Sequence, residues 1–385
     1  MRNDHRIGEK YGQIVHASAN KRTQRATNGN IRPDALDGLR RIIHRVQSTV
    51  HETRAGTISL PYRRSLYTKP MTSGSIIQQG VGRFAPSPTG DFHVGNLRTA
   101  ILAWAWARNS GRSFVLRMED IDRVRSGSAD RQIADLKAIG LDWDGTILVQ
   151  TTRSAAHMQA LEYLVEQGYA FECYCSRKDI KEAASAPHVP PGHYPGTCLN
   201  LTDTEREVRR QQLAELGRTP ALRLRAPASE WTVFDELHGS FTGPVDHFVL
   251  CRADGVPAYN LATVVDDGFQ HVDQVVRGDD LLSQAPAQAA LATLLGIAVP
   301  TYVHVPLALN EAGSRLAKRD GAVTLADLHE LGWTTEDALE WIGRSLGIDG
   351  ARTAIDIADA LPIDSLRALP LDPWVVTPPT GLPAF

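Results

Sequence analysis

A short segment near residue 90 constrains the fold of this chain more than any other part of the sequence. Residues 82–100 read GRFAPSPTGDFHVGNLRTA. Two prolines and a glycine in its middle prevent regular structure between a strand that ends near Ala85 and a helix that starts near Val94. The segment therefore predicts a strand, a tight turn and a helix, with His93 and Gly95 at the helix N-terminus.

The N-terminus of that helix is a predicted binding site for phosphate. Unpaired backbone N–H groups and the helix dipole both favour an anion there. The imidazole of His93 can hydrogen-bond phosphate oxygens, and Gly95 lets a nucleotide approach the backbone closely. Taken alone, the pair His-x-Gly is also compatible with an ordinary strand–helix turn that carries a surface histidine.

The order of apolar patterns after Val81 indicates an α/β fold. Residues 113–118 have the pattern of a strand, and residues 127–139 have that of a helix. A β-rich part with Pro-dense and Gly-dense connections, residues 171–250, interrupts this alternation and is interpreted as an insertion.

The α/β pattern resumes after the insertion. It covers residues 259–280, continues through an Ala/Leu-rich helix that ends near Gly296, and reaches a predicted strand at 302–309. After Thr324 we expect two or three short helices and then a Pro-rich tail at 369–385.

The N-terminal part, 1–75, is predicted to be a basic, disordered extension. Residues 1–70 hold 14 Lys/Arg against 5 Asp/Glu, and only residues 34–50 have an amphipathic helical pattern. Three interpretations stay open: an upstream segment that is not translated, with Met71 as the initiator; a basic tail that helps to hold RNA; or a targeting peptide.

Composition excludes several classes of protein. No apolar run approaches the roughly 18 residues that a membrane span needs, and no apolar stretch follows the basic N-terminus. Neither a membrane span nor a secretory signal is therefore predicted, and we expect a soluble cytoplasmic protein. The net charge is -3. Any contact of the folded part with RNA must therefore come from a local basic patch.

Three of the four cysteines predict a metal site. Cys173 and Cys175 form a Cys-x-Cys pair, and Cys198 follows a Pro/Gly-rich stretch that can fold back toward them. Three thiolates at this spacing favour a tetrahedral structural zinc, with His193 as the fourth ligand that chemistry alone suggests. The alternative is three reduced thiols packed in the insertion, which is the role we expect in the core for Cys251.

Two segments together resemble a known family. The strings RFAPSPTG at 83–90 and HVGN at 93–96 resemble the HIGH region of glutamate-specific class I tRNA synthetases, with Asn96 in place of the family's final histidine. The string GSRLAKRDG at 313–321 resembles a divergent KMSKS loop, although a Lys-Arg pair in such a loop is by itself typical of solvated surface. The resemblance implies that ATP binds, with Mg²⁺, at His93, Gly95, Asn96 and Lys318, and that His93 and Lys318 are catalytic.

The resemblance also assigns a glutamate pocket. The strings LRMEDID, YNLATVVDD and VRGDDL match those of the family. By position they imply that L-glutamate is bound by Arg83, Ser87, Glu119, Tyr259 and Arg277. The chemistry is suitable, because guanidinium groups pair with the substrate's carboxylates and a carboxylate pairs with its ammonium.

For the metal, the family pattern Cys-x-Cys…Tyr-x3-Cys favours Tyr194 over the neighbouring histidine. It implies one structural zinc per chain. The implied architecture is a Rossmann-like class I catalytic domain at 76–328, with the zinc-bearing insertion at about 171–250, followed by a short helical region at 329–385.

The resemblance ends near Leu328, and the chain continues from Lys318 only as far as Phe385. This short remainder, the zinc pattern and Thr263, where full-length glutamyl enzymes usually have Asn, resemble the glutamyl-Q tRNA(Asp) synthetases. These enzymes attach glutamate to the queuosine base of tRNA(Asp), so the resemblance implies tRNA(Asp) that contains queuosine as the acceptor. We also expect a monomer. Two alternatives stay open: a truncated glutamyl-tRNA synthetase that charges the 3′ end, and a non-catalytic RNA-binding paralogue.

Overall fold

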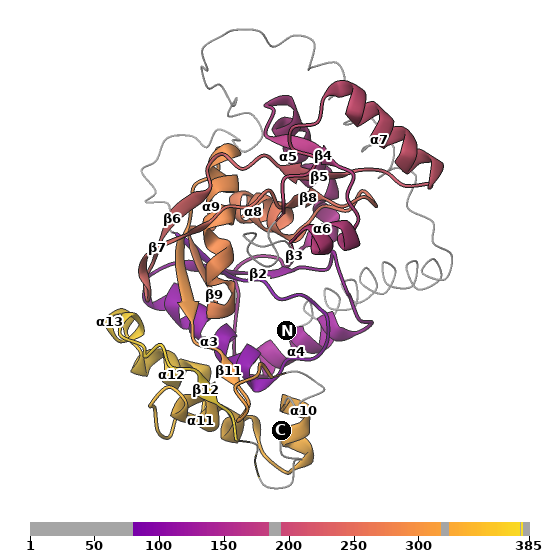
Figure 1. Ribbon diagram of the computed structural model, residues 1–385. Helices are drawn as coiled ribbons and strands as arrows, with labels where there is room; N and C mark the ends of the chain where they lie inside the picture. Colours follow the sequence, from indigo (N-terminus) through magenta and orange to yellow (C-terminus); the bar gives the residue numbers. More distant parts are fainter. Residues whose placement is uncertain (1–79, 185–193, 317–322, 378, 380–385) are drawn as a thin grey trace.

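The computed structural model describes residues 80–184, 194–316, 323–377 and 379. The predicted N-terminal extension, His193 and Lys318 lie outside the described residues. Within the described part, a central sheet separates a small antiparallel sheet from a group of C-terminal helices (Figure 1).

Seven strands form the central sheet, in the order β3-β2-β1-β9-β10-β6-β7. All neighbours run parallel except β6 and β7, which form an antiparallel pair. The strands are β1 (Val81–Phe84), β2 (Ser113–Met118), β3 (Leu148–Val149), β6 (Glu230–Asp235), β7 (Gly239–Pro244), β9 (Gln274–Gly278) and β10 (Thr301–Val305). The predicted α/β class is confirmed, and so is the predicted strand at 113–118.

The two faces of the sheet are covered by different helices. On one face lie α3 (Val94–Asn109), which is almost wholly buried, and the C-terminal helices that pack behind it. On the other face, α9 (Ala285–Leu294) packs through Ala285 and Ala289 against Tyr302 and Val275. Alternate residues of β9 and β10 therefore belong to different cores, as expected for a sheet buried on both sides.

The remaining helices of the catalytic part follow the predicted order. The helix predicted at 127–139 is α4 (Ser128–Ala138). Next come the 3₁₀ turn η2 (Gln150–Arg153) and α5 (Ser154–Glu166), and later α8 (Tyr259–Phe269) and the 3₁₀ segment η3 (Asp279–Gln284).

The predicted insertion contributes to two sheets. Strands β4 (Ala170–Cys173), β5 (Ala221–Leu224) and β8 (Val249–Cys251) form a separate antiparallel sheet, whereas β6 and β7 join the central one. The same range also holds two helices, α6 (Arg177–Ala184) and α7 (Asp203–Glu215). The boundaries proposed for a zinc-bearing subdomain stay a prediction, but the strands of that range do not form one sheet.

The strand predicted at 302–309 is interrupted. β10 ends at Val305, and after Pro306 the chain forms β11 (Ala308–Leu309), which pairs with β12 (Trp374–Val375) instead of the central sheet. Proline has no N–H to donate to a ladder, so the sheet cannot continue regularly through it.

The C-terminal region contains four short helices among the described residues, where two or three were expected. They are α10 (Leu325–Glu330), α11 (Thr335–Arg344), α12 (Ala354–Ala360) and α13 (Ile363–Arg367). The first three begin with a Thr-x-x-Asp capping box, which explains why such short helices form.

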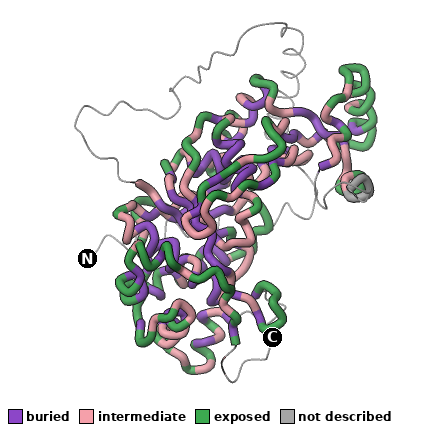
Figure 2. Tube along the Cα trace, turned by 60° about the vertical axis from the view of Figure 1, so that its left-hand side comes forward, coloured by how far each residue is buried: buried purple, intermediate pink, exposed green. Residues whose placement is uncertain are grey.

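Buried residues of α3 and of these helices belong to one apolar core. In Figure 2, buried and exposed segments alternate along the trace. The side-chain amide of Asn109 donates to the carbonyls of Ala358 and Leu361, which ties α12 to α3. Among the described helices, none is long and apolar enough to cross a membrane.

Candidate active site and cysteine cluster

The order in which the chain adds strands to the central sheet reverses between β1 and β9, which are parallel neighbours. From β1 the chain builds outward to β2 and β3 on one side, and β9 and β10 lie on the other side. In open parallel sheets, ligands bind at the carboxyl ends of the strands beside such a switch point. Arg83 lies near the end of β1, Glu119 directly follows β2, and Arg277 lies near the end of β9, so three of the five predicted glutamate ligands meet at this place.

A cavity of about 610 Å³ opens beside the N-terminus of α3. Its lining includes Ser87, His93, Gly95, Asn96 and Arg277, which brings together all described residues of the predicted ATP site and two of the predicted glutamate site. The strand, turn and helix predicted from residues 82–100 are confirmed, and His93 is the N-cap of α3.

His93 and Asn96 form a capping box. The backbone N–H of Asn96 donates to Nδ1 of His93 at 3.3 Å, and the backbone N–H of His93 donates to Oδ1 of Asn96 at 3.1 Å. Because burial lowers the pKa of His93 from 6.5 to about 4, the ring is neutral at pH 7. With Nδ1 acting as acceptor, the proton is on Nε2, which is the donor that a phosphate oxygen needs.

Gly95 is required by packing. A Cβ at this position would lie 2.7 Å from the Cβ of Ala308 and 3.0 Å from Nδ1 of His93. Any side chain would therefore push α3 away from β11 and displace the capping imidazole. The glycine thus fixes the position of His93, a role that the sequence pattern did not indicate.

The segment that contains Lys318 lies outside the described residues, but both of its flanks reach this cavity. Leu316 and Thr324 line it. The N–H of Val94 donates to the carbonyl of Val323 at 2.9 Å, and His93 and Thr324 form a β-bridge. The chain on either side of residues 317–322 thus lies beside the cavity at the N-terminus of α3.

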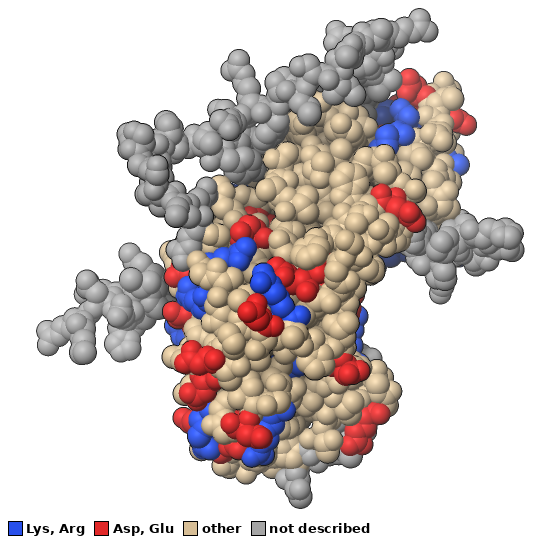
Figure 3. Space-filling model, turned by 90° about the vertical axis from the view of Figure 1, so that its left-hand side faces the viewer, with Lys and Arg blue, Asp and Glu red and all other residues tan. Residues whose placement is uncertain are grey.

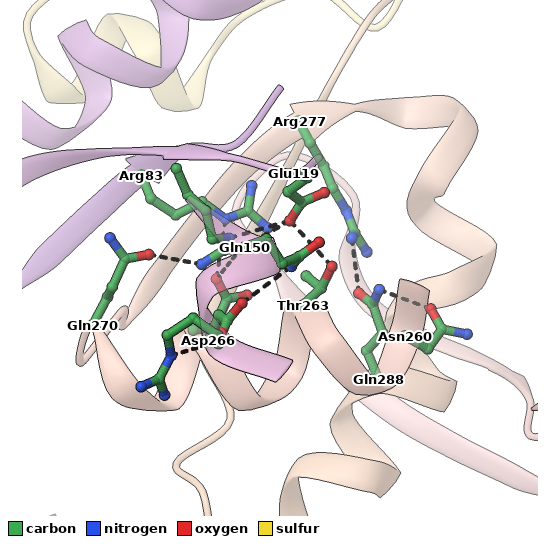
Figure 4. Close-up of polar contacts among 12 residues, drawn as sticks. Arg83, Glu119, Gln150, Asn260, Thr263, Asp266, Gln270, Arg277 and Gln288 are labelled. Carbon is green, nitrogen blue, oxygen red and sulfur yellow. Dashed lines mark hydrogen bonds and ion pairs between the residues drawn. The ribbon is translucent and has the colours of Figure 1, made fainter. Parts of the chain in front are cut away.

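A buried ionic cluster lies on the glutamate side of the site (Figure 4). Arg117, fully buried in β2, donates to Oε1 of Glu119 at 3.1 Å and to Oδ1 of Asp267 at 2.7 Å. Arg83 donates to the same oxygen of Asp267 at 3.2 Å. The hydroxyl of Thr263 donates to Glu119 at 3.1 Å. These contacts leave each charged group of the cluster with a partner of opposite charge.

The two carboxylates of this cluster titrate differently. Burial raises the pKa of Glu119, although Arg117 and Arg83 oppose that shift. Burial also acts on Asp267, but its two guanidinium partners outweigh it and hold the pKa of Asp267 below the ordinary value. Asp267 is thus the carboxylate that the cluster stabilises most strongly in its charged form.

Sequence reasoning did not single out Arg117 or Asp267. Both lie inside strings that matched the family, LRMEDID and YNLATVVDD. The only local signal was a charged residue in an otherwise apolar run, such as Arg117 within SFVLRM. A charge in a strand that is buried on both faces requires an internal partner, so this signal indicated that a counter-charge lay nearby.

Tyr259, Ser87 and Arg277, the other predicted glutamate ligands, differ in exposure and contacts. Tyr259 begins α8 and is 41% exposed. Enclosure by neighbouring groups, and then the charge of Glu119, raise the pKa of its phenol. Ser87 is exposed in the loop that lines the cavity. Arg277 is buried, and donates through Nη1 to Gln288 at 2.7 Å and through Nη2 to the carbonyl of Leu281 at 3.3 Å.

The three clustered cysteines meet at one end of the small antiparallel sheet. The sulfurs of Cys173, Cys175 and Cys198 lie within 4.8 Å of one another. The hydroxyl of Tyr194 lies 3.4 Å from the sulfur of Cys173 and 4.0 Å from that of Cys175, and the sulfurs of Cys175 and Cys198 are 3.6 Å apart. Donors around a tetrahedral zinc with ligand distances near 2.3 Å lie roughly 3.5 to 3.8 Å apart, so this set fits a zinc ion.

The protonation of these thiols is coupled. Hydrogen bonds from Cys175 and Cys198 lower the pKa of Cys173. For Cys175 the effect is opposite, because its hydrogen bonds with Cys173 and Cys198 raise its pKa. One thiolate therefore forms easily, whereas further ones need a cation between them. Cys251 is buried in β8, which confirms the expectation of a core thiol.

Charged side chains of both signs are interspersed on the face drawn in Figure 3. Among the described residues there, no broad region of one sign is visible.

Residues 81–355 match the family model described as tRNA synthetases class I (E and Q), catalytic domain. The chain is 56% identical over 298 residues to a glutamyl-Q tRNA(Asp) synthetase from Nocardia farcinica (strain IFM 10152), covering 77% of this chain and 93% of that protein. It is 44% identical over 288 residues to a protein of the same name from Cutibacterium acnes (strain DSM 16379 / KPA171202), covering 74% and 80%.

Among solved structures, the glutamate-tRNA synthetase from Elizabethkingia anophelis shares the fold of this chain. The TM-score is 0.66 at 22% sequence identity, covering 78% of this chain and 68% of that chain. The class I catalytic architecture predicted from the sequence is thus confirmed.

Proposed function

Because the chain belongs to the glutamyl-Q tRNA(Asp) synthetases, within the class I synthetases for glutamate and glutamine, we propose that it activates L-glutamate with ATP and transfers the glutamyl group to the queuosine base of tRNA(Asp). A cytoplasmic location is part of the proposal, since tRNA, ATP and glutamate are all available there.

The observation that carries the proposal is the charge pattern at the ends of β1, β2 and β9. Arg83 and Arg117 pair with the carboxylates of Glu119 and Asp267, whereas the guanidinium of Arg277 has only neutral hydrogen-bond partners among the described residues. L-Glutamate brings two carboxylates and one ammonium, and therefore one net negative charge. The side-chain carboxylate of glutamate can form an ion pair with Arg277, whereas the side-chain amide of glutamine cannot.

In the activation step, an oxygen of the glutamate α-carboxylate attacks the α-phosphorus of ATP. The bond to the bridging oxygen breaks, and pyrophosphate leaves with the electron pair. The Nε2–H of His93 and the positive end of the α3 dipole can stabilise phosphate oxygens as charge shifts onto them. Lys318 is proposed to do the same from the adjoining segment, and Mg²⁺ accompanies ATP as part of the substrate.

In the transfer step, a hydroxyl of the modified base attacks the activated carbonyl. The carbon–oxygen bond to AMP breaks, AMP leaves with the electron pair, and the hydroxyl proton is lost to AMP or solvent. An acyl phosphate is reactive enough that we assign no side chain as a dedicated base. The role of the protein in this step is to hold the two reactants in contact.

We include one structural zinc per chain in the proposal. Cys173, Cys175, Cys198 and Tyr194 would hold it, on the basis of the sulfur and hydroxyl distances around the cluster. Such an ion would supply no chemistry to the reaction. It would cross-link the start of α6 to the turn that contains Cys198.

ATP–pyrophosphate exchange without tRNA tests the activation step. We expect exchange with glutamate and little with glutamine, and we expect Lys318→Ala nearly to abolish it. Lys137→Ala, at an exposed lysine of α4 outside the cavity lining, is the matched control. Equal exchange with the two amino acids would show that the pocket is wrongly assigned.

The acceptor requires a separate experiment with radiolabelled glutamate. We expect label on tRNA(Asp) that contains queuosine, in a linkage that survives removal of the 3′-terminal adenosine by periodate and amine. Label on unmodified tRNA(Glu) that disappears with that adenosine would instead identify a truncated glutamyl-tRNA synthetase. Absence of label in both reactions, combined with absence of exchange, would favour the non-catalytic paralogue.

A further inference from the structure

Arg277 is held by a chain of buried hydrogen bonds that the glutamate assignment did not anticipate. Its Nε–H donates to Nε2 of His304 at 3.0 Å. On the other side of that ring, Nδ1 of His304 lies 2.6 Å from Oδ2 of Asp235. Both His304 and Asp235 are fully buried, with 0% exposure. Three strands, β9, β10 and β6, thus contribute one residue each to a single line of contacts.

Asp235 determines which nitrogen of His304 carries the proton. Its Oδ2 accepts the backbone N–H of His304 at 3.0 Å, and its Oδ1 accepts the N–H groups of Leu237 and His238, each at 2.9 Å. Although burial opposes the shift, the hydrogen bond from the ring of His304, followed by the backbone bonds, holds the pKa of Asp235 below its ordinary value. An ionised carboxylate can only accept, so Nδ1 of His304 must be the donor.

The consequence is an acceptor on the side that faces Arg277. With the proton on Nδ1, Nε2 presents a lone pair to the guanidinium. Burial, and then the charge of Arg277, keep the pKa of His304 low despite Asp235, so the ring is neutral. The opposite tautomer would place two N–H groups against each other.

Other contacts fix the remaining sides of the guanidinium. Gln288 accepts from Nη1 at 2.7 Å and in turn donates to Asn260 at 3.0 Å, as Figure 4 shows. The carbonyl of Leu281 accepts from Nη2 at 3.3 Å. The ring of Tyr302 stacks on His304 at 5.8 Å between ring centroids and lies 5.5 Å from the guanidinium carbon.

These contacts leave a defined set of donors. A guanidinium has five N–H groups, and the hydrogen bonds among the described residues use one each on Nε, Nη1 and Nη2. One N–H on each terminal nitrogen is left, and Arg277 lines the cavity. Two parallel N–H groups are the arrangement that binds a carboxylate in bidentate fashion.

We propose that Asp235 and His304 are positioning residues for substrate recognition: they fix the plane of the Arg277 guanidinium so that its two remaining N–H groups form a fork for a carboxylate of the amino acid. This inference rests on the proposed function, because it takes the bound acid to be glutamate. Neither residue touches the substrate.

The position of Asp235 explains why sequence reasoning missed it. It ends β6, within the range interpreted as an insertion, and reaches the site only because β6 pairs with β10 and places Asp235 opposite Tyr302. In the sequence the two residues are far apart, since His304 follows Asp235 only after β7, β8, α8, β9 and α9.

A pair of substitutions at His304 separates positioning from mere packing. Gln can place an amide oxygen near Nε2 and still accept from Arg277, whereas Asn reaches only toward Asp235. We expect His304→Asn to raise the KM for glutamate on the order of 10- to 100-fold in ATP–pyrophosphate exchange, the scale typical of lost supporting contacts. His304→Gln should recover most of the loss, and the KM for ATP should change less than about twofold in both.

Asp235→Asn tests the tautomer directly. An amide can donate to Nδ1 and so allow the wrong ring form, and we expect the KM for glutamate to rise as in His304→Asn. His238→Gln is the matched control, because the ring of His238 contacts the backbone carbonyl of His304, at 3.1 Å, and the substitution keeps the backbone N–H that donates to Asp235. It should leave both KM values unchanged.

The outcomes separate this inference from the proposed function. If the wild-type protein shows no glutamate-dependent exchange, the proposed function fails first. If the wild type is active and the His304 variants lower only thermal stability, or change both KM values equally, the positioning role is wrong. If Asp235→Asn does not fold, the comparison of Gln with Asn at position 304 still decides.

Discussion

The ionic cluster behind the glutamate site and the cysteine cluster of the small sheet are both groups of closely packed polar side chains, but they differ in charge. In the ionic cluster, guanidinium and carboxylate groups alternate, and each neutralises another. In the cysteine cluster, three thiols and a phenol are all groups that become negative when they ionise.

The difference teaches how each site becomes organised. Opposite charges within hydrogen-bonding distance hold one another in place, so the glutamate pocket is arranged by the fold itself. Groups that ionise with the same sign repel one another once charged and need a cation to hold them together. Substitutions should therefore act on the two clusters in different ways.

The largest effect is expected in the cysteine cluster. Cys198→Ala should lose the metal, which we expect at close to one zinc per chain by elemental analysis, and should lower the melting temperature strongly. Structural zinc contributes on the order of 10 kcal/mol in small peptides. Cys251→Ala, at the core thiol, should keep its zinc. A zinc-free wild type of full stability would refute the site, and zinc loss in His193→Ala but not in Tyr194→Phe would change the fourth ligand.

A smaller but clear effect is expected in the ionic cluster. Asp267→Asn leaves the buried Arg83 and Arg117 without their shared partner, and breaking such a pair typically costs about 3 to 5 kcal/mol. The free energy of unfolding in urea measures this, with no change expected in metal content. Asp349→Asn, at an exposed residue 3.9 Å from Arg344, should leave the midpoint unchanged. Equal midpoints in the two variants would show that the cluster contributes little.

His93, in the predicted ATP site, differs from both clusters. Burial alone lowers its pKa, with no charged partner contributing to the shift. Its folded pKa of about 4 lies below the ordinary 6.5. The contribution of His93 to the free energy of unfolding is therefore fully present above pH 6.5. It is lost as the pH falls toward 4, because the histidine takes up a proton more readily in the unfolded chain. At pH 5 the loss should be about 2 kcal/mol relative to pH 7.5.

Urea unfolding of wild type and His93→Asn at the two pH values measures this. Asn is a good N-cap and does not titrate, so the variant should lack that part of the pH dependence. Other titrating groups contribute equally to both proteins and cancel in the difference. The same slope in both would show that the histidine is not buried as described.

The smallest effect is expected from one hydroxyl. Thr263→Val removes the donor to Glu119 while keeping the shape of the side chain, and should cost about 1 kcal/mol of unfolding free energy. It should also raise the KM for glutamate, because Glu119 loses a group that orients it. Thr293→Val, at an exposed hydroxyl that bonds its own helix, is the control. An unchanged glutamate KM would mean that Arg117 alone orients Glu119.

The sequence predicted those parts of the site that depend on neighbouring residues. The turn before α3, with His93 as its cap, follows from local prolines and glycines, and the cysteine spacing predicted the cluster. Arg117 and Asp267 could not be paired in advance, since 150 residues separate them and only the tertiary fold brings α8 next to β2. The assignment of β6 to the insertion had the same cause: its alternating pattern fits either sheet.

The place of β6 also has a consequence for anyone who shortens or recombines this protein. β6 covers the edge of β10, whose residues are mostly buried, and β7 ends the sheet with two glycines and a proline that discourage further pairing. Deleting the whole range 171–250 would expose β10 as an unprotected apolar edge, which is a template for aggregation. A deletion that removes β4 and β5 but keeps the β6–β7 hairpin would leave β7 as the edge strand of the central sheet.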